Sequence, residues 1–258
     1  MSTDQKTIDW YNKNAEGFAG HVRNKDESVY HSLYEKPAMY QLTPDIKGKK
    51  VISLGCGSGE DSYYLKQQGA ELSMGVDISE ELIKIATKSY PDCTFKVMDM
   101  EKLDFPDDSF NFAYSSLAIH YIEDWARVFQ GVHRILKPNS FFLFSCSHPV
   151  LTAMATLEDS DKKRLKQMSI AWYRNSKKLE ITGDYLGRHS EGDLGKDFDV
   201  TAWHKPIGEI IAGAKDAGFN IDNIVEPKPL EKMKEISERD YVKLSKIPEF
   251  IIFKLLKI

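Results

Sequence analysis

One short segment, residues 50–59 with the sequence KVISLGCGSG, constrains the fold of this 258-residue chain more than any other part. Its first half is an apolar, β-branched run, which predicts a buried strand. Gly55, Gly57 and Gly59 follow at alternate positions, and a helical pattern begins at Glu60. A strand, a tight turn without Cβ atoms and a helix, in this order, bring bare main chain against a ligand.

An acidic residue closes the next predicted strand. Residues 71–77 read as this strand, and Asp77 ends it, 18 positions after Gly59. A carboxylate at that distance from a glycine-rich turn suits a bidentate hydrogen bond to a ribose diol. The two segments together therefore predict a site for a nucleoside-type cofactor.

The spacing of the glycines favours one class of nucleoside cofactor. Dinucleotide-binding enzymes use G-x-G-x-x-G, whose third glycine allows close helix packing, whereas this chain has G-x-G-x-G and Glu60 at the sixth position. Glu60 and Asp61 place two carboxylates at the start of the helix, where they would repel a pyrophosphate and tolerate a cationic group. S-adenosylmethionine (SAM) carries an ammonium and a sulfonium and no phosphate, so the electrostatics favour SAM.

Five segments extend this pattern along the chain, namely 51–59, 75–79, 97–100, 110–117 and 134–144. In this order they resemble the motifs of the class I SAM-dependent methyltransferases, and the resemblance runs from about residue 30 to the C-terminus. It is closest to the branch that holds ubiquinone- and menaquinone-type and other small-molecule methyltransferases. Ser53 and Asn111 depart from the family pattern, because acidic residues are frequent at both places.

The alternation of apolar runs and helical patterns predicts an α/β fold with a parallel sheet and right-handed crossovers. The resemblance implies a doubly wound, seven-stranded, mostly parallel sheet with helices on both faces and an antiparallel last strand. The expected strands are 51–54, 71–77, 94–98, 110–116, 140–146, 220–226 and 248–256. The expected helices are 59–68, 80–89, 123–136 and 204–217, the last closed by Gly218.

The flanking segments predict two further parts. Residues 1–45 are expected to form a helical cover, with helices over 4–20 and over 26–42, the second interrupted by Pro37. Residues 46–258 would form the SAM-binding domain. Within it, residues 148–203 do not follow the alternation and combine charges, aromatic residues and glycines after the fifth strand. We interpret them as a substrate lid, with a surface loop as the alternative.

The resemblance assigns twelve residues to the cofactor. The second motif carries the acid that holds the ribose hydroxyls, the third an aspartate for the adenine amino group, and the N-terminal cover aromatic contacts to the methionine portion. In order, the residues are Gly55, Cys56, Gly57, Gly59, Asp77, Ile78, Asp99, Met100, Ser116, Leu117, Tyr11 and Tyr34. Core packing is the alternative for the two tyrosines.

Methyl transfer mainly requires that two reactants be positioned and water excluded, and a base is needed only for an acceptor that must lose a proton. Three histidines lie near predicted strand ends and are candidate catalytic or orienting groups: His120, His148 and His204. The alternatives are a histidine packed beside a helix, a turn histidine before Pro149, and a packing element at a helix start.

The composition and charge limit the kinds of partner that the chain is expected to bind. The formal charge is −4 and the pI near 6.0, so no nucleic-acid partner is expected. No apolar run suggests a membrane span or leader, and the three cysteines are dispersed, which fits a cytoplasmic protein without disulfides or zinc. No metal is expected, because the acids of the insertion, Asp184, Glu191 and Asp193, read as solvated. The chain is expected to be a monomer or homodimer.

The sequence thus predicts an enzyme that transfers a methyl group from SAM to a small-molecule acceptor, with N, O and C nucleophiles left open and S-adenosylhomocysteine (SAH) as product. One alternative is a non-catalytic, regulatory SAM-binding protein. Another is a nicotinamide-dependent oxidoreductase, against which the missing sixth-position glycine argues. Binding of SAM or of NADH, measured separately by thermal shift, distinguishes this second alternative.

Overall fold

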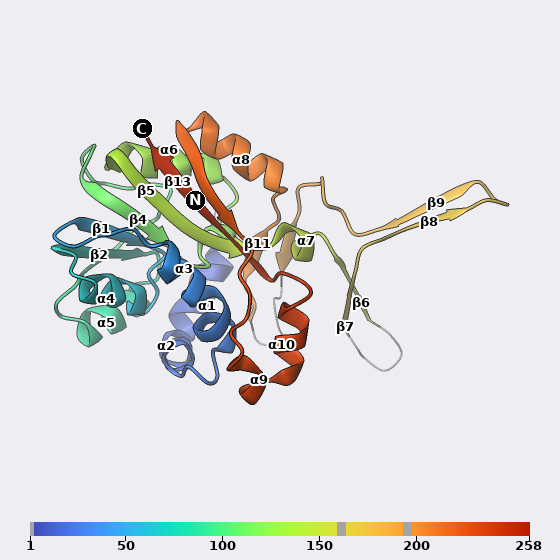
Figure 1. Ribbon diagram of the computed structural model, residues 1–258, viewed down its shortest axis with the longest axis horizontal. Helices are drawn as coiled ribbons and strands as arrows, with labels where there is room; N and C mark the ends of the chain where they lie inside the picture. The colour runs from blue at the N-terminus through green and yellow to red at the C-terminus, as the bar shows by residue number, and fades with distance from the viewer. Residues whose placement is uncertain (1–2, 159–163, 193–197) are drawn as a thin grey trace.

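A seven-stranded sheet forms the centre of the computed structural model, which describes residues 3–158, 164–192 and 198–258 (Figure 1). The strand order is β12-β13-β5-β4-β1-β2-β3. Its strands are β1 (Lys50–Leu54), β2 (Leu72–Asp77), β3 (Thr94–Val97), β4 (Phe110–Ser115), β5 (Leu136–Ser147), β12 (Phe219–Val225) and β13 (Phe250–Lys257). The first five strands pair in parallel, and β13 is antiparallel to both β5 and β12. The predicted fold class is confirmed.

The strand order fixes where a ligand can bind. From β1 the chain continues outward through β2 and β3, and then returns to β4 and β5 on the other side of β1. The direction of winding therefore reverses between β1 and β4. In open α/β sheets ligands bind in the crevice at the carboxyl ends of the strands at such a switch point.

Both faces of the sheet are buried. Along β1, Val51 packs into one core cluster with Met39 and Leu65, whereas Ile52 and Leu54 pack into the other. This alternation is the period of two expected for a strand covered on both sides. Helices α3 (Lys36–Leu42) and α4 (Glu60–Gln67) contribute to the first cluster, and α6 (Trp125–Ile135) and α8 (Ile207–Asp216) to the second.

Helix α6 shows why the sequence forms a helix there. The Asp124 side chain caps its first turn by accepting a hydrogen bond from the backbone of Arg127. Its buried side chains recur three or four positions apart and face the sheet: Trp125, Val128, Phe129, Val132 and Ile135. Outside the N-terminal cover and the insertion, the described residues also form α5 (Glu80–Ser89), α9 (Met233–Ile236) and α10 (Glu238–Leu244), with a 3₁₀ turn at Ile119–Tyr121.

The N-terminal cover differs from the prediction in its helix boundaries. The single helix expected over 4–20 is two helices, α1 (Gln5–Lys13) and α2 (Ala15–Arg23), because the backbone leaves the helical region at Asn14. A π-helix at His31–Glu35 precedes α3. Pro37 is the second residue of α3 and lies where the π-helix passes into the α-helix, with helical backbone at Glu35 and Lys36. The helical stretch is therefore not interrupted there, and the missing N–H of Pro37 falls where the hydrogen-bond pattern changes.

The insertion 148–203 consists of short elements: α7 (Pro149–Thr152), β6 (Ala155–Glu158), β7 (Arg164–Gln167), β8 (Ser169–Tyr173), β9 (Lys178–Thr182), β10 (Ser190–Gly192) and β11 (Thr201–Trp203). Figure 1 shows the β8–β9 hairpin extending away from the sheet, so this hairpin does not cover the sheet edge as the lid interpretation expected. Among the described residues of the insertion, Leu151, Thr152, Lys166 and Phe198 reach the edge of the sheet. Asp193 and most of the charged run after Glu158 lie outside the described residues.

Candidate active site

A cavity of about 370 Å³ opens at the carboxyl ends of the central strands. Gly55 after β1, Asp77 at the end of β2, Ser116 after β4 and Ser147 at the end of β5 all line it. The cavity therefore lies at the switch point of the sheet. Ten of the residues predicted from sequence line it, namely Tyr11, Gly55, Gly57, Asp77, Ile78, Asp99, Met100, Ser116, Leu117 and His120.

The glycine turn forms the floor of the cavity. Gly55 has φ +62°, and a Cβ at this position would lie 2.3 Å from the Cβ of Ala118. Both the backbone conformation and the close approach of the loop after β4 therefore require glycine here. Gly57 also lines the cavity, whereas Cys56 and Gly59 do not.

Cys56 and Gly59 support the turn from behind. The backbone N–H of Cys56 donates to Val76 O at 3.0 Å, which ties the turn to β2, and burial raises the pKa of the Cys56 thiol. Gly59, at φ +95°, begins α4, where a Cβ would lie 2.8 Å from the ring of Phe95. In the part of the chain that the structure describes, both residues pack behind the turn. A direct contact of either residue with the cofactor stays a prediction.

The Asp77 carboxylate joins the second strand to the glycine turn. One oxygen, Oδ2, accepts a hydrogen bond from Gly57 N at 2.8 Å, and the other, Oδ1, accepts one from Ser79 N at 2.9 Å. Burial raises the pKa of Asp77, and these two backbone donors oppose that shift. Each oxygen keeps a lone pair, so the carboxylate can also accept from the two hydroxyls of a ribose.

Asp99 offers a buried acceptor to the same cavity. Its Oδ1 accepts from Glu101 N at 2.9 Å, while Oδ2 is buried and has no hydrogen-bond partner among the described residues. A buried acceptor without a partner is costly. A donor such as the amino group of adenine would satisfy it, so the donor and acceptor set fits an adenosyl group.

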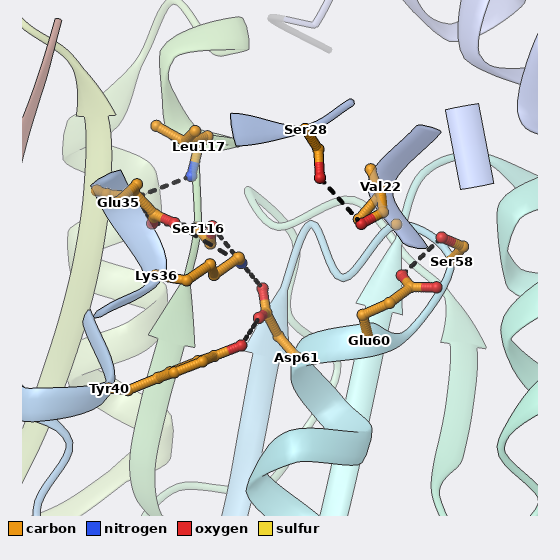
Figure 2. Close-up of polar contacts among 12 residues, drawn as sticks. Val22, Ser28, Glu35, Lys36, Tyr40, Ser58, Glu60, Asp61, Ser116 and Leu117 are labelled. Atoms are coloured by element: carbon orange, nitrogen blue, oxygen red, sulfur yellow. Dashed lines mark hydrogen bonds and ion pairs between the residues drawn. The ribbon is translucent and has the colours of Figure 1, made fainter. Parts of the chain in front are cut away.

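A buried polar network supports the loop after β4 (Figure 2). The Lys36 ammonium donates to Asp61 and, at 2.7 Å, to the Ser116 hydroxyl. Ser116 in turn donates to Glu35 Oε1 at 3.0 Å, and Ser145 donates to the same oxygen at 2.6 Å. Although burial alone would lower it, the pKa of Lys36 is raised by Asp61 and Glu35, so the lysine stays charged.

This network also fixes the residue that follows Ser116. Leu117 has φ +50°, a conformation that few non-glycine residues adopt, and its N–H donates to the Ser145 hydroxyl at 3.0 Å. The π-helix that carries Glu35 thus holds a strained loop against the cavity. Sequence reasoning missed this arrangement, because its members come from three distant segments.

The acids at the start of α4 are not free, contrary to the simple electrostatic argument from the sequence. Glu60 pairs with Arg23 at 2.7 Å, and Asp61 pairs with Lys36. Each carboxylate is therefore neutralised by a cation from the N-terminal cover. The preference for a cofactor without phosphate therefore rests less on Glu60 and Asp61 than on the closely packed glycine turn and on the carboxylates of Asp77 and Asp99.

The far side of the cavity is aromatic. The ring of Tyr11 lies edge-on to three others, with centroid distances of 5.3 Å to Phe18, 5.7 Å to Tyr121 and 6.1 Å to Phe198. Burial raises the pKa of both tyrosines, that of Tyr121 to about 12. They remain neutral near pH 7, and their ring faces can attract a sulfonium methyl group.

His120 is the predicted histidine that the structure brings into the cavity. It is buried, and burial lowers the pKa of its ring to about 4. Nδ1 accepts a hydrogen bond from Ser147 N at 3.4 Å, which assigns the proton of the neutral ring to Nε2. His120 is therefore a hydrogen-bond donor at neutral pH and a poor base.

His148 lies outside the cavity lining. Its Nδ1 accepts from Val150 N at 3.1 Å as the cap of α7, and Nε2 lies 3.0 Å from Glu226 Oε1. Burial lowers the pKa of this ring. These contacts fit the turn histidine that the sequence left open as the alternative.

His204 also lies outside the cavity lining, although its neighbour Thr152 is part of it. Nδ1 is 2.6 Å from Thr152 Oγ1 and Nε2 is 2.9 Å from Tyr185 O, so the ring accepts from the hydroxyl and donates to the carbonyl. It stacks on His189 at 4.6 Å. His204 therefore joins the two ends of the insertion, and a catalytic role for it stays a prediction.

Tyr34 is fully buried beside Val29, Met233 and Leu244, and its hydroxyl accepts a hydrogen bond from Glu249 N at 3.0 Å. It contributes to the core beneath the cavity and not to the lining. This is the alternative that the sequence left open for the tyrosines.

Several lining residues were not predicted. His31 lies in the π-helix, burial lowers its pKa to about 3, and its Nδ1 has no hydrogen-bond partner among the described residues. A π-helix leaves no clear periodicity in a sequence, so this histidine could not be singled out. The other unpredicted lining residues include Thr3, Thr7, Phe18, Tyr121, Ile122, Leu151, Thr152, Phe198, Glu249 and Phe250.

Among the described residues, no cluster of three or more His, Cys, Asp or Glu side chains is arranged to hold a metal ion. None of the helices in the described ranges has both the length and the apolar character that a transmembrane helix requires.

Comparison with known proteins agrees with this geometry. A family described as "Methyltransferase domain" matches residues 52–144, which carry the glycine turn, both aspartates and His120. A SAM-dependent methyltransferase from Mesorhizobium loti of known structure is 28% identical, with a TM-score of 0.71 over 86% of this chain and 97% of that one.

Two curated sequences are also similar. An uncharacterized protein from Haemophilus influenzae is 27% identical over 88% of this chain and 89% of its own length. A malonyl-[acyl-carrier protein] O-methyltransferase from Hamiltonella defensa is 31% identical, but over only 42% of this chain and 41% of its own length.

Proposed function

Because the chain is a class I SAM-dependent methyltransferase, we propose that it methylates a small-molecule acceptor bound in the same cavity as the cofactor. The observation that carries the proposal is the continuity of this cavity. One continuous space of about 370 Å³ reaches from the glycine turn and Asp99 to His120 and Phe198. Its size is that of a small-molecule site.

The two halves of the cavity suit the two reactants. We assign the adenosyl group to Asp77 and Asp99, whose oxygens have acceptor capacity left, and the methionine portion to Ser116 and Leu117. This leaves His120, Tyr121 and the apolar side chains beyond them for the acceptor. SAM, when bound, supplies an electrophilic methyl group on a sulfonium.

The protein's own contribution would be positioning and exclusion of water, which together can lower a barrier by up to about 7–11 kcal/mol in well-oriented systems. The Nε2–H of His120 can donate to the acceptor and turn one of its lone pairs toward the methyl group. A ring whose pKa is near 4 binds a proton weakly. The acceptor would therefore carry a free lone pair on arrival, as an unprotonated amine, a thiolate, a phenolate or a carboxylate does.

The N-terminal cover and the insertion would close the cavity together. Thr201 N donates to Thr7 Oγ1 at 2.9 Å, the Thr201 hydroxyl donates to Asp4, and the rings of Trp10 and Phe198 meet at 4.4 Å. These contacts join residues 1–45 to the end of residues 148–203. We propose that this joint, and not the β8–β9 hairpin, acts as the substrate cover.

The test is a transfer assay with methyl-labelled SAM and a cell extract separated by filtration into small molecules and macromolecules. We expect label and SAH to form with the small-molecule filtrate, and His120→Ala to reduce the rate while SAM binding persists. A panel of amines, phenols, thiols and carboxylates would then identify the class of acceptor. It includes a malonyl thioester of a small thiol, because one similar protein is named for a malonyl group on a carrier protein.

Label that enters only the macromolecular fraction would overturn the small-molecule assignment. SAM binding without transfer to either fraction would favour a non-catalytic, SAM-binding protein.

A further inference from the structure

The β8–β9 hairpin carries an apolar face that is exposed to solvent. In the antiparallel register Ile170 lies opposite Ile181, and Trp172 lies opposite Leu179. Alternate residues of a strand share a face, so these four side chains form one surface. Their exposed fractions are 75% for Ile170, 63% for Ile181, 57% for Trp172 and 53% for Leu179.

The opposite face of the hairpin is polar. The Tyr173 hydroxyl donates to Glu180 Oε2 at 2.9 Å, and the Lys178 ammonium donates to Glu180 Oε1 at 2.6 Å. The hairpin is thus amphipathic although it projects away from the rest of the chain (Figure 1). A two-stranded hairpin alone is at best marginally stable in water. This one needs an apolar partner for its four-residue face.

We propose that this face packs against the same face of a second copy of the chain, with the two hairpins antiparallel about a two-fold axis. Each apolar side chain can bury on the order of 100 Å², so eight of them bury roughly 800 Å². Apolar atoms make up about 60% of an interface, which gives a total near 1,300 Å². Stable complexes bury about 1,200–2,000 Å².

The charges favour a second copy and set its direction. Residues 168–182 contain three cationic residues, Arg174, Lys177 and Lys178, and one acid, Glu180, so the hairpin has a formal charge of +2. Because the whole chain has a formal charge of −4, the rest of the chain carries −6. Antiparallel packing brings each cationic tip toward the acidic body of the other copy, whereas parallel packing would bring the two tips together. An anionic lipid surface would repel the same body.

Sedimentation of the full-length chain over a range of concentrations tests the proposal. We expect a dimer, and Trp172→Ser should raise its dissociation constant by about 100-fold or more, because a buried aromatic anchor leaves the interface twice. Tyr173→Ser is the matched control, since it removes the neighbouring aromatic residue from the polar face. Unchanged thermal melting of both variants would show that the sheet is intact.

Cysteine cross-linking then locates the contact. In a Cys93→Ser background, with the other two cysteines buried, a mixture of the Leu179→Cys and Ile181→Cys variants should form disulfide-linked dimers under mild oxidation, because antiparallel packing places residue 179 of one copy beside residue 181 of the other. Glu180→Cys, one position along the same strand and on the other face, should not. Cross-linking of Glu180→Cys alone, or dimerisation unaffected by Trp172→Ser, would overturn the proposal. So would a monomer, including one that sediments with vesicles of anionic phospholipid.

Discussion

The two halves of the cavity are built in different ways. The cofactor half consists of strand ends and turns, and its groups are main-chain atoms and carboxylates held by backbone hydrogen bonds, as Asp77 is by Gly57 and Ser79. The acceptor half is assembled from side chains of distant segments, among them His120, Tyr121 and Phe198. The sheet alone therefore fixes the cofactor half, whereas the acceptor half depends on how the N-terminal cover and the insertion pack.

The largest effect is expected at the floor of the cofactor half. Gly55→Ala places a Cβ 2.3 Å from the Cβ of Ala118 at φ +62°, so the turn or the loop after β4 must move. We expect a loss of unfolding free energy of about 3 kcal/mol and of SAM affinity by more than ~100-fold. Urea denaturation and titration calorimetry measure the two effects.

The control for that comparison is Gly208→Ala in α8, where nothing lies within 4 Å of the added Cβ. Its unfolding free energy should change by no more than about 1 kcal/mol, in the stabilising direction. If Gly55→Ala behaved like Gly208→Ala, the account of the turn would be wrong.

The next effect separates the halves by ligand. Asp77→Ala removes the ribose acceptor and should weaken SAM binding by about 1–3 kcal/mol, while the KM for the acceptor stays nearly constant. Asp104→Ala, at an exposed acid outside the cavity, is the matched control. Equal SAM affinity of the Asp77 variant and the unmodified protein on calorimetry would refute the assignment.

The halves should also respond to pH with opposite sign. The folded pKa of His120, about 4, lies below its ordinary 6.5, so its contribution to stability is present above pH 6.5 and is lost as the pH falls toward 4. Burial raises the pKa of Asp77, so its contribution is present in acid and is lost as the pH rises through the folded pKa. Between pH 7 and pH 5 the His120 contribution should fall by about 2 kcal/mol.

Urea titrations of the unmodified protein and of His120→Phe at these two pH values measure that contribution. The variant keeps a ring of similar size but cannot take up a proton, so its stability should fall less on acidification. Parallel losses in the two proteins would show that the imidazole is not held neutral by burial.

The smallest effect tests which histidine acts in the acceptor half. His120→Ala should lower kcat by about 10- to 100-fold with SAM affinity nearly unchanged, because it removes a donor from the cavity. His204→Ala should lower the unfolding free energy by about 1–3 kcal/mol and leave kcat largely intact, because it removes the ring partner of the Thr152 hydroxyl and of the Tyr185 carbonyl. The reverse pattern would assign the catalytic role to His204.

The sequence predicted which residues line the proposed cofactor half, because its determinants are local. The three glycines and Asp77 belong to one strand-turn-helix-strand unit, and a glycine pattern records a backbone requirement that any reader of the sequence can recognise. The same alternation predicted the parallel strands, whereas the antiparallel last strand was implied by the family resemblance. In the sheet only the element ends were displaced, whereas outside it the helix expected over 4–20 is divided at Asn14, where a local side-chain bond ends the first helix. Helices α9 and α10 and the short strands of the insertion were not predicted.

The acceptor half could not be predicted to the same extent. His120, His148 and His204 look alike in the sequence, and only their hydrogen-bond partners, which come from distant segments, separate the cavity residue from the other two. His31 was missed because a π-helix has no simple apolar period. A site whose side chains come from distant segments produces no recognisable local pattern in the sequence.

A crystal structure with bound SAH tests the central claim most directly. The account predicts the ribose hydroxyls on Asp77, the adenine amino group on Asp99, and the sulfur directed toward His120 and Tyr121 in the remaining part of the cavity. Adenosine bound elsewhere, or a sulfur that faces away from His120, would contradict it.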